Sequence, residues 1–181
     1  MSQKLIPPSN FTEMPWRNGG GTTFEIFRGI GLTAVDDDSW DWRLSMARIE
    51  SDGPFSALPN IDRVFVSLGP DAIALTIDGD ESVVRMLDQR AFAGEANVSA
   101  RLLGGATTDL NLMGQRDRVM LSCQVGAGRF DVMPGDVVGL FALVDGQLGG
   151  NPVAEGSVLL LDVERPQLVT FLGGVGFRVR P

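Results

Sequence analysis

The sequence contains no histidine, and this absence excludes more kinds of site than any other feature of its composition. Ser-His-Asp and Cys-His catalysis both need an imidazole base, so neither is available. Zinc sites built on imidazole and the two-His-one-carboxylate iron site are excluded for the same reason. With a single cysteine, only an all-oxygen site for Mg²⁺ or Ca²⁺ is left. The nearest acidic cluster, Asp36-Asp37-Asp38, lacks the alternating spacing of a calcium loop, so we predict a solvated turn there, no metal and no cofactor.

Positive charge is also scarce. The chain has 15 Lys and Arg against 23 Asp and Glu, a formal net charge of −8, and no basic cluster. Such a surface repels phosphate backbones, so we predict that the protein does not bind nucleic acid. The lone Cys123 lies in a strand-like run and cannot form an internal disulfide, which favours a buried, inert thiol.

Long apolar runs are missing as well. The N-terminus has no apolar core of signal-peptide length, and the longest runs, such as Val137–Val144, are far too short to cross a membrane. We therefore expect a protein of a reducing cytoplasm that does not bind membranes.

No segment shows the 3.6-residue periodicity of an amphipathic helix of three turns. Short alternating segments recur instead, separated by turns drawn from 23 Gly and 10 Pro, which predicts an all-β sandwich or barrel. The clearest strand is Asp41–Glu50. Its apolar positions fit the two-residue period of a strand better than the 3.6-residue period of a helix. Asp78-Gly79-Asp80 predicts a hairpin. In Lys4–Phe11, two prolines indicate an extended edge without a helix, and Gly29–Ser39 and Gln89–Glu95 are predicted to be irregular.

At 181 residues the chain suits one domain or two tightly joined halves. A faint echo between Gly69–Val84 and Gly135–Val163 favours two similar β halves. We place them at about residues 1–105 and 106–181, packed as a single compact unit over 1–181.

The stretch Met14–Glu25 places Trp, Arg and Asn directly before three consecutive glycines. Ordering three glycines is entropically expensive, which suits a backbone that turns tightly and comes close to another group. The alternative is a simple turn before a strand, with Trp16 as a packing anchor. We expect Gly19–Gly21 to lie at the mouth of a barrel.

Three strands carry polar pairs between apolar residues, and a fourth strand opens with an arginine. The pairs are Thr23 with Glu25, Arg43 with Ser45, and Asp109 with Asn111, and the arginine is Arg63. If these side chains share a barrel interior, they must pair with each other or with a ligand. Structural ion pairs or solvated side chains are the alternative. Arginine suits a carboxylate ligand, and Glu25 or Asp109 would serve as a general acid or base if burial raised its pKa.

Six ordered motifs resemble the HutD/Ves family and cover roughly residues 1–125. They are P-W-R-N-G-G-G-T-T-F-E at Pro15–Glu25, W-R-L-S-M-A at Trp42–Ala47, G-P-F-S at Gly53–Ser56, I-D-R at Ile61–Arg63, F-A-G-E at Phe92–Glu95 and D-L-N-L-M at Asp109–Met113. The resemblance implies a bacterial, cytoplasmic protein with a cupin-type β-barrel or jelly roll arranged as a bicupin.

The same resemblance implies an accessory or regulatory role in histidine utilisation, with a pathway intermediate such as formylglutamate as ligand. The motif positions expected to bind it are Asn18, Thr22, Glu25, Arg43, Ser45, Arg63, Asp109 and Asn111.

Three functions compete on these observations. We rank a metal-independent binding protein for a small carboxylate first. A metal-free cupin isomerase or hydrolase using Glu25 or Asp109 is second, and a protein-interaction module braced by the motif residues is third. The oligomeric state is not fixed by the sequence, and analogy with other cupins indicates a homodimer as the possible assembly.

Overall fold

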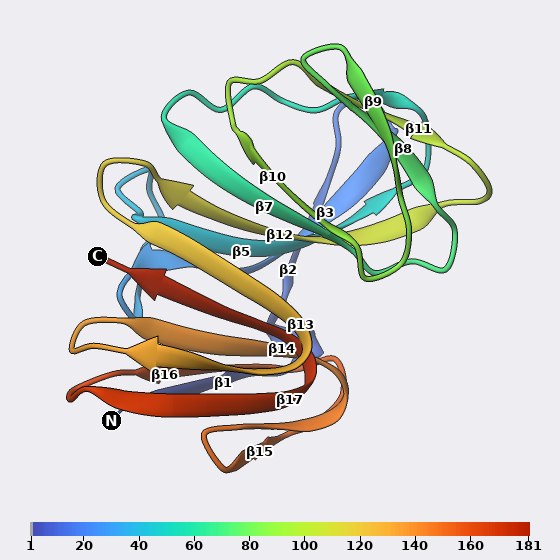
Figure 1. The fold of residues 1–181 in the computed structure, drawn as a ribbon. Helices are drawn as coiled ribbons and strands as arrows, with labels where there is room; N and C mark the ends of the chain where they lie inside the picture. The colour runs from blue at the N-terminus through green and yellow to red at the C-terminus, as the bar shows by residue number, and fades with distance from the viewer. Residues whose placement is uncertain (1) are drawn as a thin grey trace. The chain divides into compact units, whose positions relative to one another are not determined.

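The computed structural model describes residues 2–181, and almost all of its regular structure is β-strand, which confirms the predicted all-β class. Contacts divide the chain into two compact units, each discontinuous in sequence (Figure 1). Unit 1 takes the described residues of Met1–Phe11 together with Arg28–Trp42 and Arg118–Pro181, and unit 2 takes Thr12–Phe27 and Arg43–Asp117. Two similar halves that pack as one unit stay a prediction.

Unit 2 is built on two antiparallel sheets. The larger has the strand order β10-β7-β12-β5-β3-β2 and the smaller β6-β11-β8-β9. The strands are β2 (Thr12–Pro15), β3 (Gly21–Ile30), β5 (Trp42–Ile49), β6 (Gly53–Pro54), β7 (Ile61–Ser67), β8 (Ile73–Ile77), β9 (Asp80–Val84), β10 (Gln89–Ala93), β11 (Val98–Leu102) and β12 (Thr107–Gln115). Both strand orders have two ends, so these sheets are open rather than closed into a barrel.

The core of unit 2 forms between its two sheets. Ile49 and Phe65 come from the larger sheet and pack with Ile73 and Leu75 of the smaller one, all at most 1% exposed. Facing sheets that bury alternate residues of each strand make a β-sandwich, the arrangement of a jelly roll. The hairpin predicted at Asp78-Gly79-Asp80 is confirmed, since β8 and β9 pair across it.

Unit 1 contains a six-stranded sheet with the order β1-β16-β14-β17-β13, and β15 pairs with β14. Its elements are β1 (Gln3–Ile6), η1 (Pro8–Asn10), β4 (Thr33–Ala34), β13 (Met120–Val132), β14 (Val137–Leu148), β15 (Asn151–Val153), β16 (Val158–Asp162) and β17 (Gln167–Arg180). Bulges interrupt the pairing of the long strand β17 with both of its neighbours. Such bulges bend strands, which lets one sheet wrap around a core that includes the stacked rings of Phe130 and Phe171.

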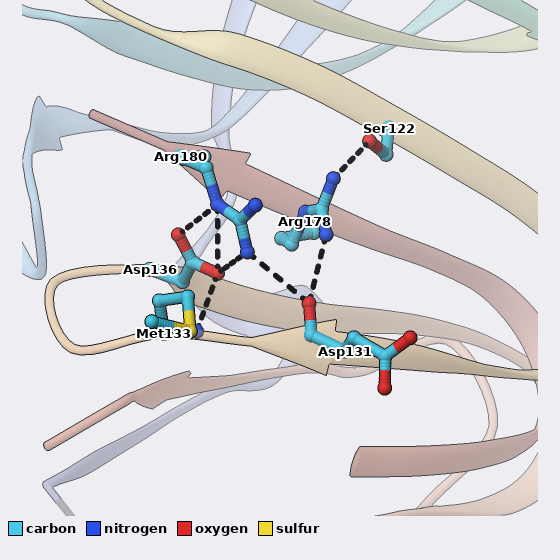
Figure 2. A network of polar contacts seen from close by, with 6 residues as sticks. All are labelled: Ser122, Asp131, Met133, Asp136, Arg178 and Arg180. Carbon is cyan, nitrogen blue, oxygen red and sulfur yellow. Dashed lines mark hydrogen bonds and ion pairs between the residues drawn. The ribbon is translucent and has the colours of Figure 1, made fainter. Parts of the chain in front are cut away.

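A polar network fixes the end of β17 in unit 1 (Figure 2). Arg180 binds the Asp136 carboxylate through Nε and Nη2, at 2.8 and 2.7 Å, and Asp136 is only 1% exposed. The Met133 N–H donates to the same carboxylate, and Arg178 donates to the Asp131 carbonyl oxygen at 2.8 Å. Burial raises the pKa of Asp136, but the hydrogen bonds from Arg180 and Met133 outweigh burial and leave the pKa below its usual value.

Three local predictions are wrong. Gln89–Ala93, predicted to be irregular, is strand β10. Antiparallel pairing with β7 supplies its backbone hydrogen bonds, although its residues show no strand pattern. Gly29–Ser39 is not wholly a loop, since β3 runs on to Ile30 and pairs with β4. A short 3₁₀-helix occupies Pro8–Asn10, because a proline in the first turn needs no N–H donor. Within the described chain, no helix is long and apolar enough to cross a membrane.

Candidate ligand-binding cavity

A cavity of about 590 Å³ opens in unit 2. It is lined by Met14, Pro15, Trp16, Arg17, Asn18, Thr23, Arg43, Ser45, Ala47, Pro54, Phe55, Ser56, Leu58, Arg63, Asp109, Asn111 and Met113. The volume lies within the range of small-molecule sites, and the lining combines apolar side chains with convergent polar and charged groups that can orient a ligand. The buried lining residues mark its deep end and the exposed ones mark its mouth.

Strand pairing explains why the polar residues meet. β7 and β12 are antiparallel neighbours, with Asp109 opposite Ser67 and Met113 opposite Arg63. Residues directly opposite in such a pair share a face, and alternate residues along each strand share it too. Asn111 therefore lies on the same face as Asp109 and diagonal to Arg63. That face points into the sandwich.

Arg63 is the buried cationic side chain at the deep end of the cavity. It is 7% exposed, and its guanidinium carbon lies 5.3 Å from the ring centre of Phe55 and 5.1 Å from that of Phe92. Nη2 donates to Asn111 at 3.0 Å, whereas the buried Nε has no hydrogen-bond partner among the described residues. Burial lowers the pKa of Arg63, and Arg43 lowers it further, while Asp109 opposes both. A buried donor without an acceptor is unfavourable, which marks a place for an acceptor group.

Asp109 is the buried carboxyl group beside this arginine. It is 1% exposed, and the Asn111 side-chain amide donates a close hydrogen bond to it. Burial raises the pKa of Asp109 to about 8, although Arg63 and Asn111 act in the opposite direction. At neutral pH the group is therefore mostly a neutral acid, and it leaves most of the Arg63 charge uncompensated.

Arg43 is held differently. Its Nε lies 2.7 Å from the Glu25 carboxylate, and both side chains are about one-fifth exposed or less. The pair joins neighbouring strands β5 and β3. Arg43 lines the cavity, whereas Glu25 lies outside the lining and balances the arginine's charge.

A braced turn forms one side of the mouth. Trp16 donates from its indole nitrogen to Thr23 at 2.8 Å and from its backbone N–H to Gly21 at 2.9 Å. The Asn18 side-chain oxygen accepts from the Gly20 N–H at 3.0 Å. A Cβ on Gly21 would approach the Arg48 carbonyl oxygen to 2.3 Å, so the backbone there comes too close for any other residue. The glycine run thus positions Trp16 and Asn18 as cavity walls.

Six of the eight predicted site residues line the cavity: Asn18, Arg43, Ser45, Arg63, Asp109 and Asn111. Thr22 does not, because it points away from its neighbour Thr23, which does. Glu25 also lies outside the lining, but it forms an ion pair with Arg43, which is part of the lining. The predicted site set omitted Arg17, Trp16 and Phe55, although all three lie within the quoted motifs. Among residues 2–181, no three His, Cys, Asp or Glu side chains are grouped to hold a metal ion.

The HutD family profile matches residues 8–165. The chain belongs to the HutD family. An uncharacterised 21.2 kDa protein from the hutC 3′ region of Pseudomonas putida is 42% identical over 135 residues, 71% of this chain and 68% of that protein. Protein Ves of Cronobacter sakazakii is 33% identical over 117 residues, which span 64% of this chain and 62% of Ves.

Solved structures agree with this family and with the predicted cupin-type fold. HutD from Pseudomonas fluorescens SBW25 superposes with a TM-score of 0.83 at 27% identity, covering 99% of this chain and 97% of that one. The Escherichia coli pirin YhhW superposes with a TM-score of 0.65 at 9% identity, covering 99% and 98%, and shows a common fold alone. This HutD-family protein is therefore all-β and cupin-type, with open sheets.

Proposed function

We propose that this HutD-family protein binds a small carboxylate in the unit 2 cavity without a metal ion, as an accessory or regulatory protein of histidine utilisation. The observation that carries the proposal is the buried Arg63, whose Nε lacks an acceptor at the deep end of the cavity. A carboxylate oxygen supplies that acceptor with the charge and planar geometry that a guanidinium matches.

The remaining lining suits the same ligand class. Arg17 and Arg43 add cationic groups, while Asp109, mostly neutral at pH 7, is a hydrogen-bond donor that accommodates an anion. Ser45 and Asn18 offer further polar groups for orienting an amide or formyl group. A lining with this excess of positive charge disfavours a cation, which supports metal-independent binding. The hutC 3′ location in the P. putida relative's name supports the pathway, with a formylglutamate-like intermediate as ligand.

Isothermal titration with N-formylglutamate and the other intermediates of histidine breakdown tests this proposal. We expect binding at sub-millimolar concentration and its loss in Arg63→Met, which keeps much of the side-chain volume between Phe55 and Phe92. Arg101→Met is the matched control, because Arg101 pairs with Glu81 on the exposed surface. The proposal fails if none of these acids binds at millimolar concentration, or if Arg63→Met binds as well as Arg101→Met.

Catalysis by Asp109 is the second candidate, and one observation favours it. A carboxyl group with a pKa of about 8 that lines a cavity can exchange a proton with a bound substrate near neutral pH. Glu25 is less suited, because it lies outside the lining and pairs with Arg43. Chromatography of any acid that binds, after incubation with the protein, should then show an isomerised or hydrolysed product that Asp109→Asn does not form. Recovery of the acid unchanged would leave binding as the function.

A further inference from the structure

We propose that Ser67 is a positioning residue for Asp109, and that its buried hydroxyl donates a hydrogen bond to the carboxylate when Asp109 ionises. Ser67 does not line the cavity, so it acts on a bound ligand only through Asp109. The inference goes beyond the proposed function, because it concerns the proton on Asp109 and holds whichever ligand the cavity binds.

Strand register places the two side chains next to each other. Ser67 and Asp109 are directly opposite in the antiparallel pair of β7 and β12, and residues in this position point to the same face of the sheet. Opposite Cβ atoms in such a pair are about 4.5–5.5 Å apart. At that separation, rotation of the side chains alone brings a hydroxyl within hydrogen-bonding distance of a carboxylate.

The Ser67 hydroxyl is a buried donor that needs an acceptor. Ser67 is 0% exposed, and its Oγ has no hydrogen-bond partner among residues 2–181. Its backbone is fixed, because the N–H donates to the Asp88 carbonyl oxygen at 3.0 Å and the carbonyl oxygen accepts from the Leu87 N–H at 2.7 Å. Rotation about χ1 is therefore the movement left to the hydroxyl. A buried hydroxyl without a partner is unfavourable, so a neighbouring acceptor would stabilise it.

Asp109 has a carboxyl oxygen that can accept this bond. Its Oδ1 accepts from the Asn111 side-chain amide, whereas its Oδ2 has no hydrogen-bond partner in the described part of the chain. The hydroxyl of Thr107, which lies on the same face of β12, already donates to the Asp71 carbonyl oxygen at 3.2 Å. Of the hydroxyls that β7 and β12 carry on this face, Ser67 is thus the one without a partner.

The charges around Asp109 make its proton sensitive to such a donor. Arg63 lies on β7, and Arg43 lies on β5 with Glu25 beside it at 2.7 Å. The smaller sheet contributes apolar side chains to the core. Burial raises the pKa of Asp109 to about 8, although Arg63 and the hydrogen bond to its Oδ1 act in the opposite direction. A hydrogen bond from Ser67 to the ionised form lowers that pKa, so the hydroxyl helps to keep the proton exchangeable near neutral pH.

Carboxyl-carbon NMR of wild type and Ser67→Ala between pH 5 and 10 tests the inference. The signal of Asp109 is the one that disappears in Asp109→Asn, and the chain has no histidine or tyrosine to titrate in this range. We expect the pKa of Asp109 to rise by about one in Ser67→Ala, a tenfold weaker acid, because the ionised form loses a hydrogen bond. Ser157→Ala, at a buried serine of unit 1, is the control and should leave the pKa unchanged. An unchanged pKa in Ser67→Ala would overturn the proposal.

Urea denaturation at pH 6 and pH 9 gives a second readout. Because Asp109 keeps its proton to a higher pH in Ser67→Ala, this variant should lose stability relative to wild type between the two values, by roughly fivefold in the unfolding equilibrium constant. Cys123, whose pKa burial raises to about 12, titrates alike in both proteins and cancels from the comparison. In the Asp109→Asn background, Ser67→Ala should have the same effect at both pH values. A pH-independent effect in the wild-type background would mean that Ser67 serves packing alone, against the proposal.

Ligand binding gives a third readout, which rests on the proposed function. Ionised Asp109 repels a carboxylate bound at Arg63, so N-formylglutamate should bind more weakly as pH rises through the pKa of Asp109. Relative to pH 6, calorimetry at pH 9 should show roughly fivefold tighter binding to Ser67→Ala than to wild type, because more Asp109 stays protonated in the variant. Equal or weaker relative binding to the variant would contradict the role of Ser67. If no acid binds to either protein, the proposed function fails, and the titration of Asp109 still decides whether Ser67 acts on it.

Discussion

The side-chain oxygen of Asn111 accepts a 3.0 Å hydrogen bond from Arg63 while both residues are buried. The amide nitrogen of Asn111 donates to Asp109 at the same time. Asparagine carries an acceptor and a donor on one planar group, so it can bridge a buried cation and a buried carboxyl group. The deep end of the cavity depends on this bridge.

Replacing Asn111 with alanine should therefore be costly. Arg63 Nη2 and the Asp109 carboxyl group would both lose a buried partner, so we expect the free energy of unfolding to fall by about 2–3 kcal/mol. Urea denaturation measures the change. Asn10→Ala, at an exposed position, is the control and should have little effect. An Asn111→Ala protein as stable as the control would show that the bridge does not stabilise the fold.

Asp109 should make stability depend on pH. Burial raises its pKa in the folded protein to about 8, well above the usual 3.8. Between these values the folded state keeps the proton that the unfolded state releases, so stability falls as pH rises from about 4 to 8 and changes no further above that. Asp109→Asn cannot titrate. Urea denaturation of both proteins at pH 5, 7 and 9 should show the variant gaining stability relative to wild type as pH rises. A difference that does not vary with pH would contradict the raised pKa.

Much of the cavity follows from strand periodicity. The alternation in Arg43–Ser45 and Asp109–Asn111 predicts a shared face, because the side-chain period of a strand is two residues. The register between neighbouring strands cannot be read from the alternation within each strand. Asn111 meets Arg63 only because β7 and β12 pair with Met113 opposite Arg63, an offset set by packing of the whole sheet.

The misplaced features have similar causes. Thr22 and Thr23 are chemically identical neighbours, so only the phase of β3 against the sandwich decides which lines the cavity. Gln89–Ala93 has no β-branched residue, and it becomes a strand through pairing with β7. Arginine is an ordinary surface residue, so nothing in the sequence separates Arg17 from the other exposed arginines. Its place at the cavity mouth depends on the folded turn.

The Glu25–Arg43 pair should couple more strongly than a surface pair. Its side chains are 17% and 20% exposed, whereas those of Glu50 and Arg48 are 44% and 60% exposed. A double-mutant cycle to alanine should give a coupling energy of about 1–3 kcal/mol for the first pair and under about 0.5 kcal/mol for the second. Urea denaturation of the four proteins in each cycle supplies the values. Equal coupling in the two cycles would mean that partial burial does not strengthen this ion pair.

Gly21→Ala tests the close approach behind the mouth. The added Cβ would lie 2.3 Å from the Arg48 carbonyl oxygen and 3.1 Å from the Trp16 ring, so backbone and ring must both shift. We expect a loss of about 1–3 kcal/mol in unfolding free energy and weaker binding of carboxylates. Gly53→Ala is the control, because its Cβ would meet nothing within 4 Å. Equal stability of the two variants would show that the backbone around Gly21 can shift to accommodate a Cβ at little energetic cost.

The ion pair in unit 1 gives a prediction independent of the cavity. Asp136 is 1% exposed and binds Arg180 through two donors, as Figure 2 shows. Arg180→Met would leave the buried carboxylate with the Met133 N–H and the nearby charge of Arg178, so we expect a loss of about 1.5–3 kcal/mol, the range for a hydrogen bond to a charged group. Because the folded pKa of Asp136 is lowered, the wild-type contribution is present above the usual pKa of 3.8 and is lost as pH falls below it. The cost of Arg180→Met, measured by urea denaturation, should thus be larger at pH 7 than at pH 3. Arg129→Met, on β13, is the control. A cost that is the same at both pH values would show that the pairing does not depend on ionised Asp136.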